Sequence, residues 1–298
     1  MEKLTSCPLC GEINFIPFLQ SNDFFLTQEE YTIVSCSSCG MKFVNPRPEP
    51  GEIGKYYESP EYVSHDTGKK NSLNFLYKRL RKISIERKYN LVKKHARGKK
   101  LLDVGCGTGE FLFFCEKKGF KVTGIEPGEK PRSFAQLEYK LNVEAEGYLD
   151  QMVPQQFDVI TMWHVLEHIH PLHERIDIIL DIMKHDGTLI IAVPNCDSWD
   201  ARYYGKFWAA YDLPRHLYHF SQETMKTLAQ KHKLIIDEII PMKLDAFYIS
   251  LLSEKYSRGK QNFFRAFVNG VRSNSFANKS NNNYSSLIYV MKRGKWLQ

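Results

Sequence analysis

From residue 99 onward, short apolar runs alternate with segments of helical length, and this alternation restricts the fold more than any other feature of the sequence. Four of the runs are residues 101–104, 121–125, 157–162 and 188–193. Runs of this length suit strands that are buried on both faces, and the segments between them can form crossover helices. The pattern predicts an α/β fold built around a parallel sheet.

The chain divides into three predicted parts. Residues 1–48 contain two cysteine pairs and end in a proline cluster, which marks a boundary. Residues 49–98 form a linker and a basic helical segment, either one bridging helix or a helix pair. Residues 99–298 form the α/β domain, in which an insertion at about 244–283 separates two further strands at 234–240 and 286–291. An insertion of this length is a functional lid or a disordered loop.

The composition excludes several other classes of protein. Of the 298 residues, 43% are hydrophobic and 25% are charged, as in an ordinary globular protein, so disorder, collagen and coiled coil are excluded. No apolar run approaches the roughly 18–20 residues that cross a bilayer, and the first residues contain no signal-peptide core. We therefore expect a cytoplasmic protein without a transmembrane segment.

A glycine-rich loop after the first strand is the main chemical signal. Asp103 ends this strand, and Gly105, Gly107 and Gly109 follow at every second position. Glycines allow the backbone to approach a ligand closely, although dinucleotide sites have the different spacing G-x-G-x-x-G. Glu126 ends the second strand, where its carboxylate can accept hydrogen bonds from two ribose hydroxyls. Together these residues predict an adenosine-type cofactor; the alternative is a tight strand–helix turn.

Residues 103–109 and Glu126 resemble the first motif and the ribose-binding acid of the class I S-adenosylmethionine-dependent methyltransferases. The resemblance covers residues 99 to about 240, and it implies a Rossmann-like seven-stranded sheet with helices on both faces and S-adenosyl-L-methionine as cofactor. Residues 157–168 are similar to the fourth strand and following helix of the subgroup that includes ubiquinone-type O-methyltransferases. The further cofactor contacts that this resemblance implies are Gly147, Tyr148 and Leu149 at the adenine and Trp163 and His164 at the methionine end.

Methyl transfer to a hydroxyl or a carbon acid also needs a base, and an imidazole is suited to remove a proton near neutral pH. The candidate catalytic residues are His216, which is the first choice, His168 and His164. Residues 208–221 are similar to a segment that covers the acceptor site in uncharacterised members of the subgroup. This segment contributes the candidate substrate-binding residues Asp212, Arg215 and His219.

His164, Glu167 and His168 also match the pattern H-x-x-E-H, in which two helical histidines bind zinc and the glutamate acts as base. The strand predicted up to residue 162 places His164 at a strand exit, where one continuous ligand helix is not expected. A metallohydrolase is therefore the less favoured interpretation. His168 is equally compatible with a structural role, because a neutral imidazole can bridge buried backbone groups.

Two C-x-x-C-G sequences occur near the start of the chain. Cys7 and Cys10 form the first pair, and Cys36 and Cys39 form the second. Four thiolates provide the closed tetrahedral site of a structural zinc ion, which would stabilise a zinc-ribbon-like domain without taking part in catalysis. A redox role for the pairs is the alternative.

Residues 69–100 contain thirteen lysines or arginines and a single acid, Glu86. This segment predicts an anionic partner, which could be RNA, a membrane surface, or a phosphorylated or lipid-linked substrate. The alternative is a solvated helix face.

The sequence therefore favours a methyltransferase that acts on a small-molecule acceptor of the sugar, polyprenyl/quinone or lipid-linked type, by O- or C-methylation. The first alternative is an RNA methyltransferase that binds RNA through the zinc ribbon and the basic helix, because the front of the chain also resembles certain ribosomal RNA guanine methyltransferases. Zinc-bearing sugar C-methyltransferases are similar at the front end as well. The second alternative is a non-catalytic scaffold that only binds the cofactor.

Overall fold

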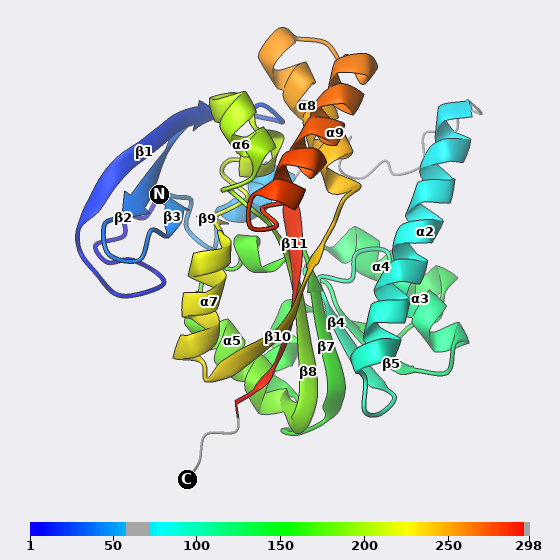
Figure 1. The fold of residues 1–298 in the computed structure, drawn as a ribbon. Helices are drawn as coiled ribbons and strands as arrows, with labels where there is room; N and C mark the ends of the chain where they lie inside the picture. Colours follow the sequence, from blue (N-terminus) through cyan, green and yellow to red (C-terminus); the bar gives the residue numbers. More distant parts are fainter. Residues whose placement is uncertain (58–71, 295–298) are drawn as a thin grey trace. The chain divides into compact units, whose positions relative to one another are not determined.

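A computed structural model describes residues 1–57 and 72–294 of the chain (Figure 1). The contacts between Cα atoms group these residues into two compact units. The first unit consists of the described residues within 1–59, 164–173 and 192–289. The second unit consists of the described residues within 60–163, 174–191 and 290–298. Each unit is therefore assembled from separate stretches of sequence.

The larger sheet has seven strands in the order β10-β11-β8-β7-β4-β5-β6, and helices lie on both of its faces (Figure 1). The strand β4 pairs in parallel with β5 and with β7, and β5 pairs in parallel with β6. This arrangement confirms the predicted α/β fold. The strands of this sheet are β4 (Lys100–Val104), β5 (Lys121–Ile125), β6 (Val143–Glu144), β7 (Phe157–Trp163), β8 (Met183–Pro194), β10 (Leu234–Pro241) and β11 (Ser286–Arg293).

The predicted strands agree with the observed ones except at the start of β8. The sequence predicts that this strand begins at residue 188, but it begins at Met183. Residues 184–186 are polar and are not buried, so hydropathy gives no signal for the first part of the strand. The six residues of β7 before Trp163 are all buried, as expected for a central parallel strand.

The helices of the α/β fold follow the predicted segments. The basic segment forms one long helix, α2, and its residue Val92 is fully buried. The helix α3 begins directly after Gly109 and buries Phe111, Leu112 and Cys115, the three side chains expected to face inward. The helices before residue 240 are α2 (Ser72–His95), α3 (Glu110–Lys117), α4 (Glu129–Glu138), α5 (Leu172–Ile182), α6 (Trp199–Tyr204) and α7 (Gln222–Lys231).

The N-terminal residues form a second sheet, which belongs to the first unit. Its strands are β1 (Phe15–Asn22), β2 (Glu30–Cys36), β3 (Lys42–Val44) and β9 (Tyr218–His219), in that order. The three pairings are antiparallel, and β3 pairs with β9 through the register Lys42↔His219. The strand that completes this sheet is thus supplied by residues far along the chain.

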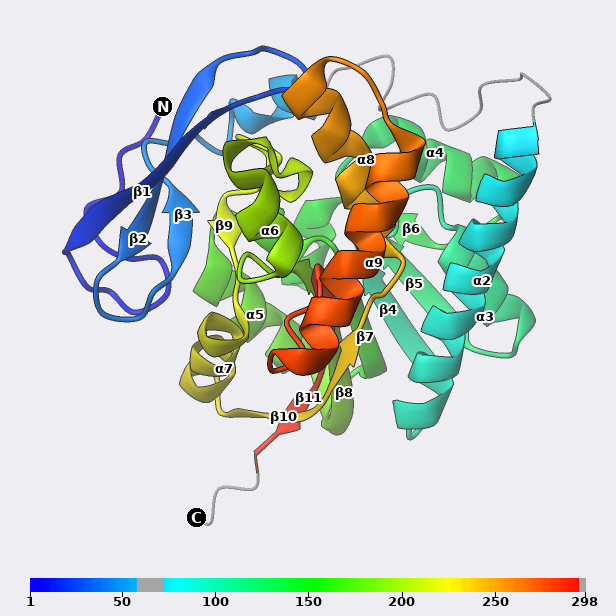
Figure 2. The ribbon, with the colours of Figure 1, turned by 45° about the horizontal axis from the view of Figure 1, so that its top comes forward.

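Residues 244–283, predicted as an insertion, form a helical hairpin and not an irregular loop. The hairpin consists of α8 (Asp245–Arg258) and α9 (Phe263–Lys279), which lie side by side in Figures 1 and 2. Asn262 caps the start of α9, because its side-chain oxygen accepts a hydrogen bond of 3.0 Å from the Arg265 N–H.

Several cations of residues 69–100 have partners within the second unit. Lys88 lies 4.6 Å from the ring centroid of Trp163, and Arg97 lies 3.8 Å from Asp186. Residues 69–71 lie outside the described part of the chain, and side chains of the segment are described from residue 81 onward. The anionic partner of this segment stays a prediction.

Among the helices that the structure describes, none combines the length and the apolar character needed to cross a bilayer.

Candidate functional site

The glycine-rich loop occupies the turn between β4 and α3 in the second unit. Gly105, Gly107 and Gly109 have φ angles of 72°, 56° and 80°, which side-chain-bearing residues rarely adopt. A Cβ atom at Gly109 would also lie 2.8 Å from Leu141 and 2.9 Å from Ala135. The backbone therefore requires glycine at these positions. The loop ends at Gly109, where α3 begins, so it lies next to the N-terminal N–H groups of that helix.

Asp103 lies beneath this loop and is 2% exposed. Its Oδ1 accepts a hydrogen bond of 2.6 Å from the hydroxyl of Thr161, on the neighbouring strand β7. Burial raises the pKa of Asp103 to about 7, although the Thr161 hydrogen bond and Lys88 act in the opposite direction. The carboxyl group is thus held in place and titrates near neutral pH.

Glu126 follows β5 directly, and its carboxylate closes the glycine loop. One oxygen accepts a hydrogen bond of 2.8 Å from the Gly107 N–H, and the other accepts one of 2.9 Å from the Gly128 N–H. Burial raises the pKa of Glu126, and the two backbone hydrogen bonds oppose this effect. The structure therefore brings together the loop and the acid that the sequence predicted as parts of one site.

The other predicted cofactor contacts of the second unit have different environments. Leu149 is fully buried, whereas Tyr148 is 42% exposed, and both lie in the 3₁₀ turn η2 (Glu146–Gln151) with Gly147. Trp163 ends β7, and the ring of Phe111 meets it edge to face at a centroid distance of 5.7 Å. The indole N–H of Trp163 is buried and has no hydrogen-bond acceptor among the described residues. A bound molecule could supply that acceptor.

His164 belongs to the first unit and has a φ angle of 57°, which is unusual for a residue with a side chain. Its Nδ1 lies 3.4 Å from Oε1 of Glu167, and its Nε2 lies 3.2 Å from Oδ2 of Asp245. Burial alone would lower the pKa of His164, but these two carboxylates outweigh it and raise the pKa to about 9. The imidazole is therefore protonated at neutral pH.

The H-x-x-E-H pattern does not form a zinc-binding helix here. His164 follows the end of β7, and residues Leu166–His168 form a short 3₁₀ turn, η3. The two histidines are therefore not spaced along one α-helix, as the metalloprotease arrangement requires. This geometry disfavours the metallohydrolase interpretation.

Glu167, His168 and His216 form a compact polar cluster within the first unit. One ligand-type atom from each residue lies within 4.8 Å of the others, so the group could hold a metal ion or move a proton. Glu167 is fully buried; neither carboxylate oxygen accepts a well-aligned hydrogen bond from a described residue, and its ion pair with His164 spans 3.4 Å between Oε1 and Nδ1. Burial would raise the pKa of Glu167, but the adjacent His164 lowers it.

The hydrogen bonds of His216 indicate its tautomer, whereas those of His168 involve two different partners. Nδ1 of His168 lies 3.0 Å from the Arg215 carbonyl oxygen, and Nδ1 of His216 lies 2.8 Å from the Ala210 carbonyl oxygen. A carbonyl oxygen only accepts, so Nδ1 of His216 carries a proton, and Nε2 in its neutral form has the free lone pair. Nδ1 of His168 also lies 2.8 Å from the Tyr57 hydroxyl, which can donate as well as accept, so the contacts of His168 fit either tautomer. Burial and the neighbouring His216 lower the pKa of His168 to about 4, so His168 is neutral at pH 7.

Arg215 and Asp212 form a buried ion pair in the first unit. Arg215 is 1% exposed and donates to both Asp212 oxygens at 2.7 Å and 3.1 Å. It also donates to Asp23 at 3.0 Å and to the Tyr56 carbonyl at 3.1 Å. The guanidinium is thus engaged within the protein, and it connects the N-terminal residues with residues 212–215. Arg215 lowers the pKa of Asp212 against the opposing effect of burial.

His219 lies in β9 and is 3% exposed. Its Nε2 has no hydrogen-bond partner among the described residues, and its ring meets Tyr211 edge to face at 5.1 Å. Burial lowers the pKa of His219, so the ring is neutral.

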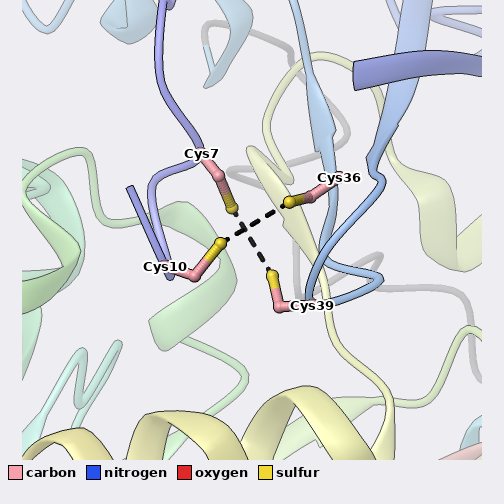
Figure 3. A group of neighbouring side chains, drawn as sticks. All are labelled: Cys7, Cys10, Cys36 and Cys39. Carbon is pink, nitrogen blue, oxygen red and sulfur yellow. Dashed lines mark hydrogen bonds between the residues drawn. The ribbon is translucent and has the colours of Figure 1, made fainter. Parts of the chain in front are cut away.

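The four N-terminal cysteines converge from two loops (Figure 3). The sulfur of Cys7 lies 3.6 Å from that of Cys39, and the sulfur of Cys10 lies 3.5 Å from that of Cys36. All four sulfur atoms lie within 4.8 Å of one another. Each pair spans a turn closed by the glycine that follows it, because Gly11 N–H bonds to the Cys7 carbonyl and Gly40 N–H to the Cys36 carbonyl. The predicted ligands therefore come together as a set.

Sequence reasoning did not assign a role to several residues around the histidines. Glu167 has a sequence signal, since it lies within the H-x-x-E-H pattern, but the sequence does not show that His216 is its neighbour. Asp245 and Asp23 have no signal, because each is an isolated acid whose partner, His164 or Arg215, is distant in the chain.

Comparison with known proteins gives an independent view of the chain. A family model described as a methyltransferase domain matches residues 75–238, which is more than half of the chain. The ubiquinone biosynthesis O-methyltransferase of Pseudomonas fluorescens is 39% identical over 106 residues, which cover 33% of this chain and 45% of that protein. The corresponding enzyme of Pseudomonas entomophila is 36% identical over 107 residues with the same coverage. The chain thus spans about half the length of these relatives.

Solved structures have a similar fold. A SAM dependent methyltransferase from Archaeoglobus fulgidus gives a TM-score of 0.51 at 20% identity and covers 75% of this chain and 100% of its own. Geranyl diphosphate C-methyltransferase from Streptomyces coelicolor A3(2) gives a TM-score of 0.55 at 12% identity and covers 81% of this chain and 96% of its own. At these identities the likeness to solved structures concerns the fold alone. The match to the family model extends over residues 75–238, which include the glycine loop and Glu126. On that match the chain belongs to the methyltransferase domain family.

Proposed function

We propose that the protein transfers a methyl group from S-adenosyl-L-methionine to an oxygen or carbon atom of a small-molecule acceptor. One observation carries this proposal: three glycines with positive φ angles form the turn after β4, and Glu126 closes it from the end of β5. The family match supports it. Relatives and structural neighbours named as ubiquinone biosynthesis and geranyl diphosphate methyltransferases favour a small molecule of the polyprenyl or quinone type as acceptor.

The proposed cofactor-binding residues are the predicted ones that belong to the second unit, and the cofactor contact predicted for His164, in the first unit, stays a prediction from the sequence. Glu126 would accept hydrogen bonds from ribose hydroxyls in place of the backbone N–H groups that it now binds. Trp163 has a buried N–H that requires an acceptor. A sulfonium cofactor supplies an activated methyl group, and the protein aligns this group and excludes water. The residues of the second unit in this set are Asp103, Gly105, Gly107, Gly109, Glu126, Gly147, Tyr148, Leu149 and Trp163.

We propose His216 as the base that accepts a proton from the acceptor. Its Nδ1 proton is held by the Ala210 carbonyl, so Nε2 is the atom that takes up the proton. The Asp212 carboxylate, 3.9 Å from Nε2, would stabilise the imidazolium that forms. Arg215 would position Asp212, and His168 and His219 are neutral neighbours suited to hydrogen bonding with an acceptor. His164 is already protonated and would act through its charge.

We propose that Cys7, Cys10, Cys36 and Cys39 bind a structural zinc ion. Zinc–sulfur bonds of about 2.3 Å in a tetrahedron place the sulfur atoms about 3.8 Å apart. Two of the sulfur–sulfur pairs, at 3.5 Å and 3.6 Å, are near this spacing without being disulfides. Four thiol donors leave no open coordination position, so the ion would have a structural role.

Calorimetric titration of the purified protein with S-adenosylhomocysteine tests the cofactor assignment. We expect saturable binding that Glu126→Ala weakens about 10- to 100-fold, because charged hydrogen bonds contribute about 1.5–3 kcal/mol. Glu129→Ala removes an exposed acid three residues away and serves as the matched control, with unchanged affinity. Equal affinity of wild type and Glu126→Ala would contradict the assignment.

Acceptor screening then tests the reaction itself. Quinone precursors, nucleotide sugars and structured RNA are incubated with the protein and a radiolabelled methyl donor. Transfer to a small molecule supports the proposal. Transfer to RNA alone would replace it with the RNA methyltransferase alternative, and cofactor binding without transfer to any class would favour the non-catalytic scaffold.

A further inference from the structure

The helix α9 has an unusual distribution of side chains for a helix that packs on a protein core. Its buried positions hold small or polar side chains: Ala266, Asn269, Gly270, Ser273 and Ala277. Its largest side chains lie outside, and Phe263, Phe264 and Phe267 are 56%, 77% and 61% exposed. A surface helix normally turns its apolar residues toward the core, so α9 shows the opposite arrangement.

Hydrogen bonds hold the small and polar face of α9 inward. The Ser273 hydroxyl donates to the buried Asp200 carboxylate at 2.7 Å, and the Asn269 amide donates to the Tyr204 hydroxyl at 2.9 Å. A Cβ atom at Gly270 would lie 2.5 Å from the ring of Phe247 on α8, so the absence of a side chain at Gly270 makes room for this ring. Turning α9 to bury its phenylalanines would break these contacts, which fixes the aromatic residues in solvent.

The spacing of residues along α9 separates the exposed side into two arcs. With about 3.6 residues per turn, Phe263, Phe264, Phe267 and Val271 lie on one arc, next to the buried face. The exposed cations Arg265, Arg272 and Lys279 lie on the arc beyond it. A helix with aromatic residues on one side and arginine or lysine beside them is typical of segments that lie in the interface of a membrane.

The charge of the whole hairpin agrees with this arrangement. Residues 243–279 contain seven lysines or arginines and two acids, a formal charge of +5. Both acids have cationic partners, since Asp245 lies 3.2 Å from His164 and Glu254 lies 3.2 Å from Arg258. Exposed apolar side chains also occur at Leu244, which precedes α8, and at Tyr248 within α8. The hairpin thus offers an apolar strip with an excess of positive charge.

We propose that α8 and α9 form a docking surface for an anionic lipid bilayer, with the phenylalanines of α9 inserted at the level of the headgroups and its cations on the lipid phosphates. Charge complementarity selects this occupant, because the exposed cations of α9 match a negative surface and its aromatic residues gain by leaving water. The inference concerns where the protein binds and does not depend on methyl transfer.

Vesicle co-sedimentation of the 298-residue protein tests this surface. The vesicles contain phosphatidylcholine alone or equal parts of phosphatidylcholine and phosphatidylglycerol. We expect the protein to sediment with the mixed vesicles and to be released as the salt concentration rises, since salt screens the attraction. The variant Phe263→Ser/Phe264→Ser should weaken the binding about tenfold or more, because inserted aromatic side chains contribute to it. Arg265→Gln/Arg272→Gln should weaken it on the mixed vesicles.

Matched controls come from the same unit. Ile235→Ser removes an apolar side chain that is 52% exposed on β10, and Lys231→Gln/Lys233→Gln removes two exposed cations near α7. Both controls should bind as the wild type does, and thermal melts should show that every variant is folded. Absence of vesicle binding, or phenylalanine variants that bind normally, would overturn the proposal. A self-associating wild type that becomes monomeric in Phe263→Ser/Phe264→Ser, without vesicle binding, would assign the surface to a second copy of the chain.

Discussion

Asp103 shows how a single buried group can make the stability of this protein depend on pH. Burial raises its pKa to about 7, from the ordinary value of 3.8. The folded protein therefore retains this proton over a pH range in which the unfolded chain releases it. Below pH 3.8 both states are protonated, and as the pH rises toward 7 the folded state progressively loses stability relative to the unfolded chain.

We therefore expect the unfolding free energy of the ligand-free wild type to fall by up to about 4 kcal/mol, through Asp103, as the pH rises from 3.8 to about 7. Asp103→Asn keeps an oxygen that can accept from Thr161 but does not ionise, so its pH dependence should be flatter. Urea denaturation at a series of pH values measures the difference. Asp150→Asn, at an exposed position, controls for the lost charge and should follow the wild type. If the unfolding free energies of the wild type and Asp103→Asn change with pH in parallel, the pKa of Asp103 is not raised in the folded protein.

At the scale of elements, the two cysteine turns are local structures that depend on one another. Each turn is closed by a glycine with a positive φ angle, 84° at Gly11 and 72° at Gly40. The turns contribute one pair of sulfur atoms each, so neither turn completes the four-cysteine set alone. Zinc would link the first loop to the end of β2, and the antiparallel sheet β1-β2-β3 would gain stability from the bound ion.

Replacing Cys36 and Cys39 with serine should therefore release the zinc and destabilise residues 1–45. Metal analysis of the purified protein should find one zinc per chain in the wild type and none in the variant. Hydrogen exchange of residues 1–45 should be faster in the variant. Ser37→Ala/Ser38→Ala changes the two exposed residues between these cysteines and should keep the metal. A metal content that is the same in the cysteine variant would exclude the site.

At the scale of the molecule, the Arg215 side chain connects parts of the first unit that are far apart in sequence. Its ion pair with Asp23 joins residues separated by 192 positions, and both side chains are buried. Asp23 also accepts hydrogen bonds from the backbone N–H groups of Phe25, Leu26 and Thr27, which shape the loop after β1. The N-terminal sheet therefore depends on residues of the later chain for a strand and for a counter-ion.

We expect Arg215→Ala to lower the unfolding free energy by about 3 kcal/mol, because it leaves buried carboxylates without their cation. The double variant Arg215→Ala/Asp23→Ala should be destabilised by clearly less than the sum of the single variants. Chemical denaturation of the wild type, the two single variants and the double variant measures this coupling. Strict additivity would mean that the ion pair does not stabilise the first unit, and Arg215 would then be free for a direct role with an acceptor.

Local patterns in the sequence were sufficient for most of the fold and for two sets of site residues. The strands β4, β5, β7, β10 and β11 follow from short apolar runs. In β4, β7 and β11 nearly every position is buried, which requires apolar side chains, whereas β5 and β10 are apolar runs that are only partly buried. The loop with Asp103 and the Glu126 carboxylate follows from fixed spacing after two adjacent parallel strands. The cysteine set follows from the repeat C-x-x-C-G. In each case a local residue pattern identifies the parts that the fold then brings together.

The tertiary structure alone decided which distant residues meet. It placed His216 beside Glu167 and His168, Asp245 beside His164, and β9 beside β3, and no local spacing encodes these contacts. It also decided that α9 directs its small residues inward and its phenylalanines outward, because the inward face bonds to Asp200 and Tyr204. The sequence by itself thus determined the strands of the sheet, the glycine loop and the two cysteine turns, because each of these has a recognisable local pattern of residues. The surroundings of the histidines and the exposed face of the hairpin depend on packing between segments far apart in the chain.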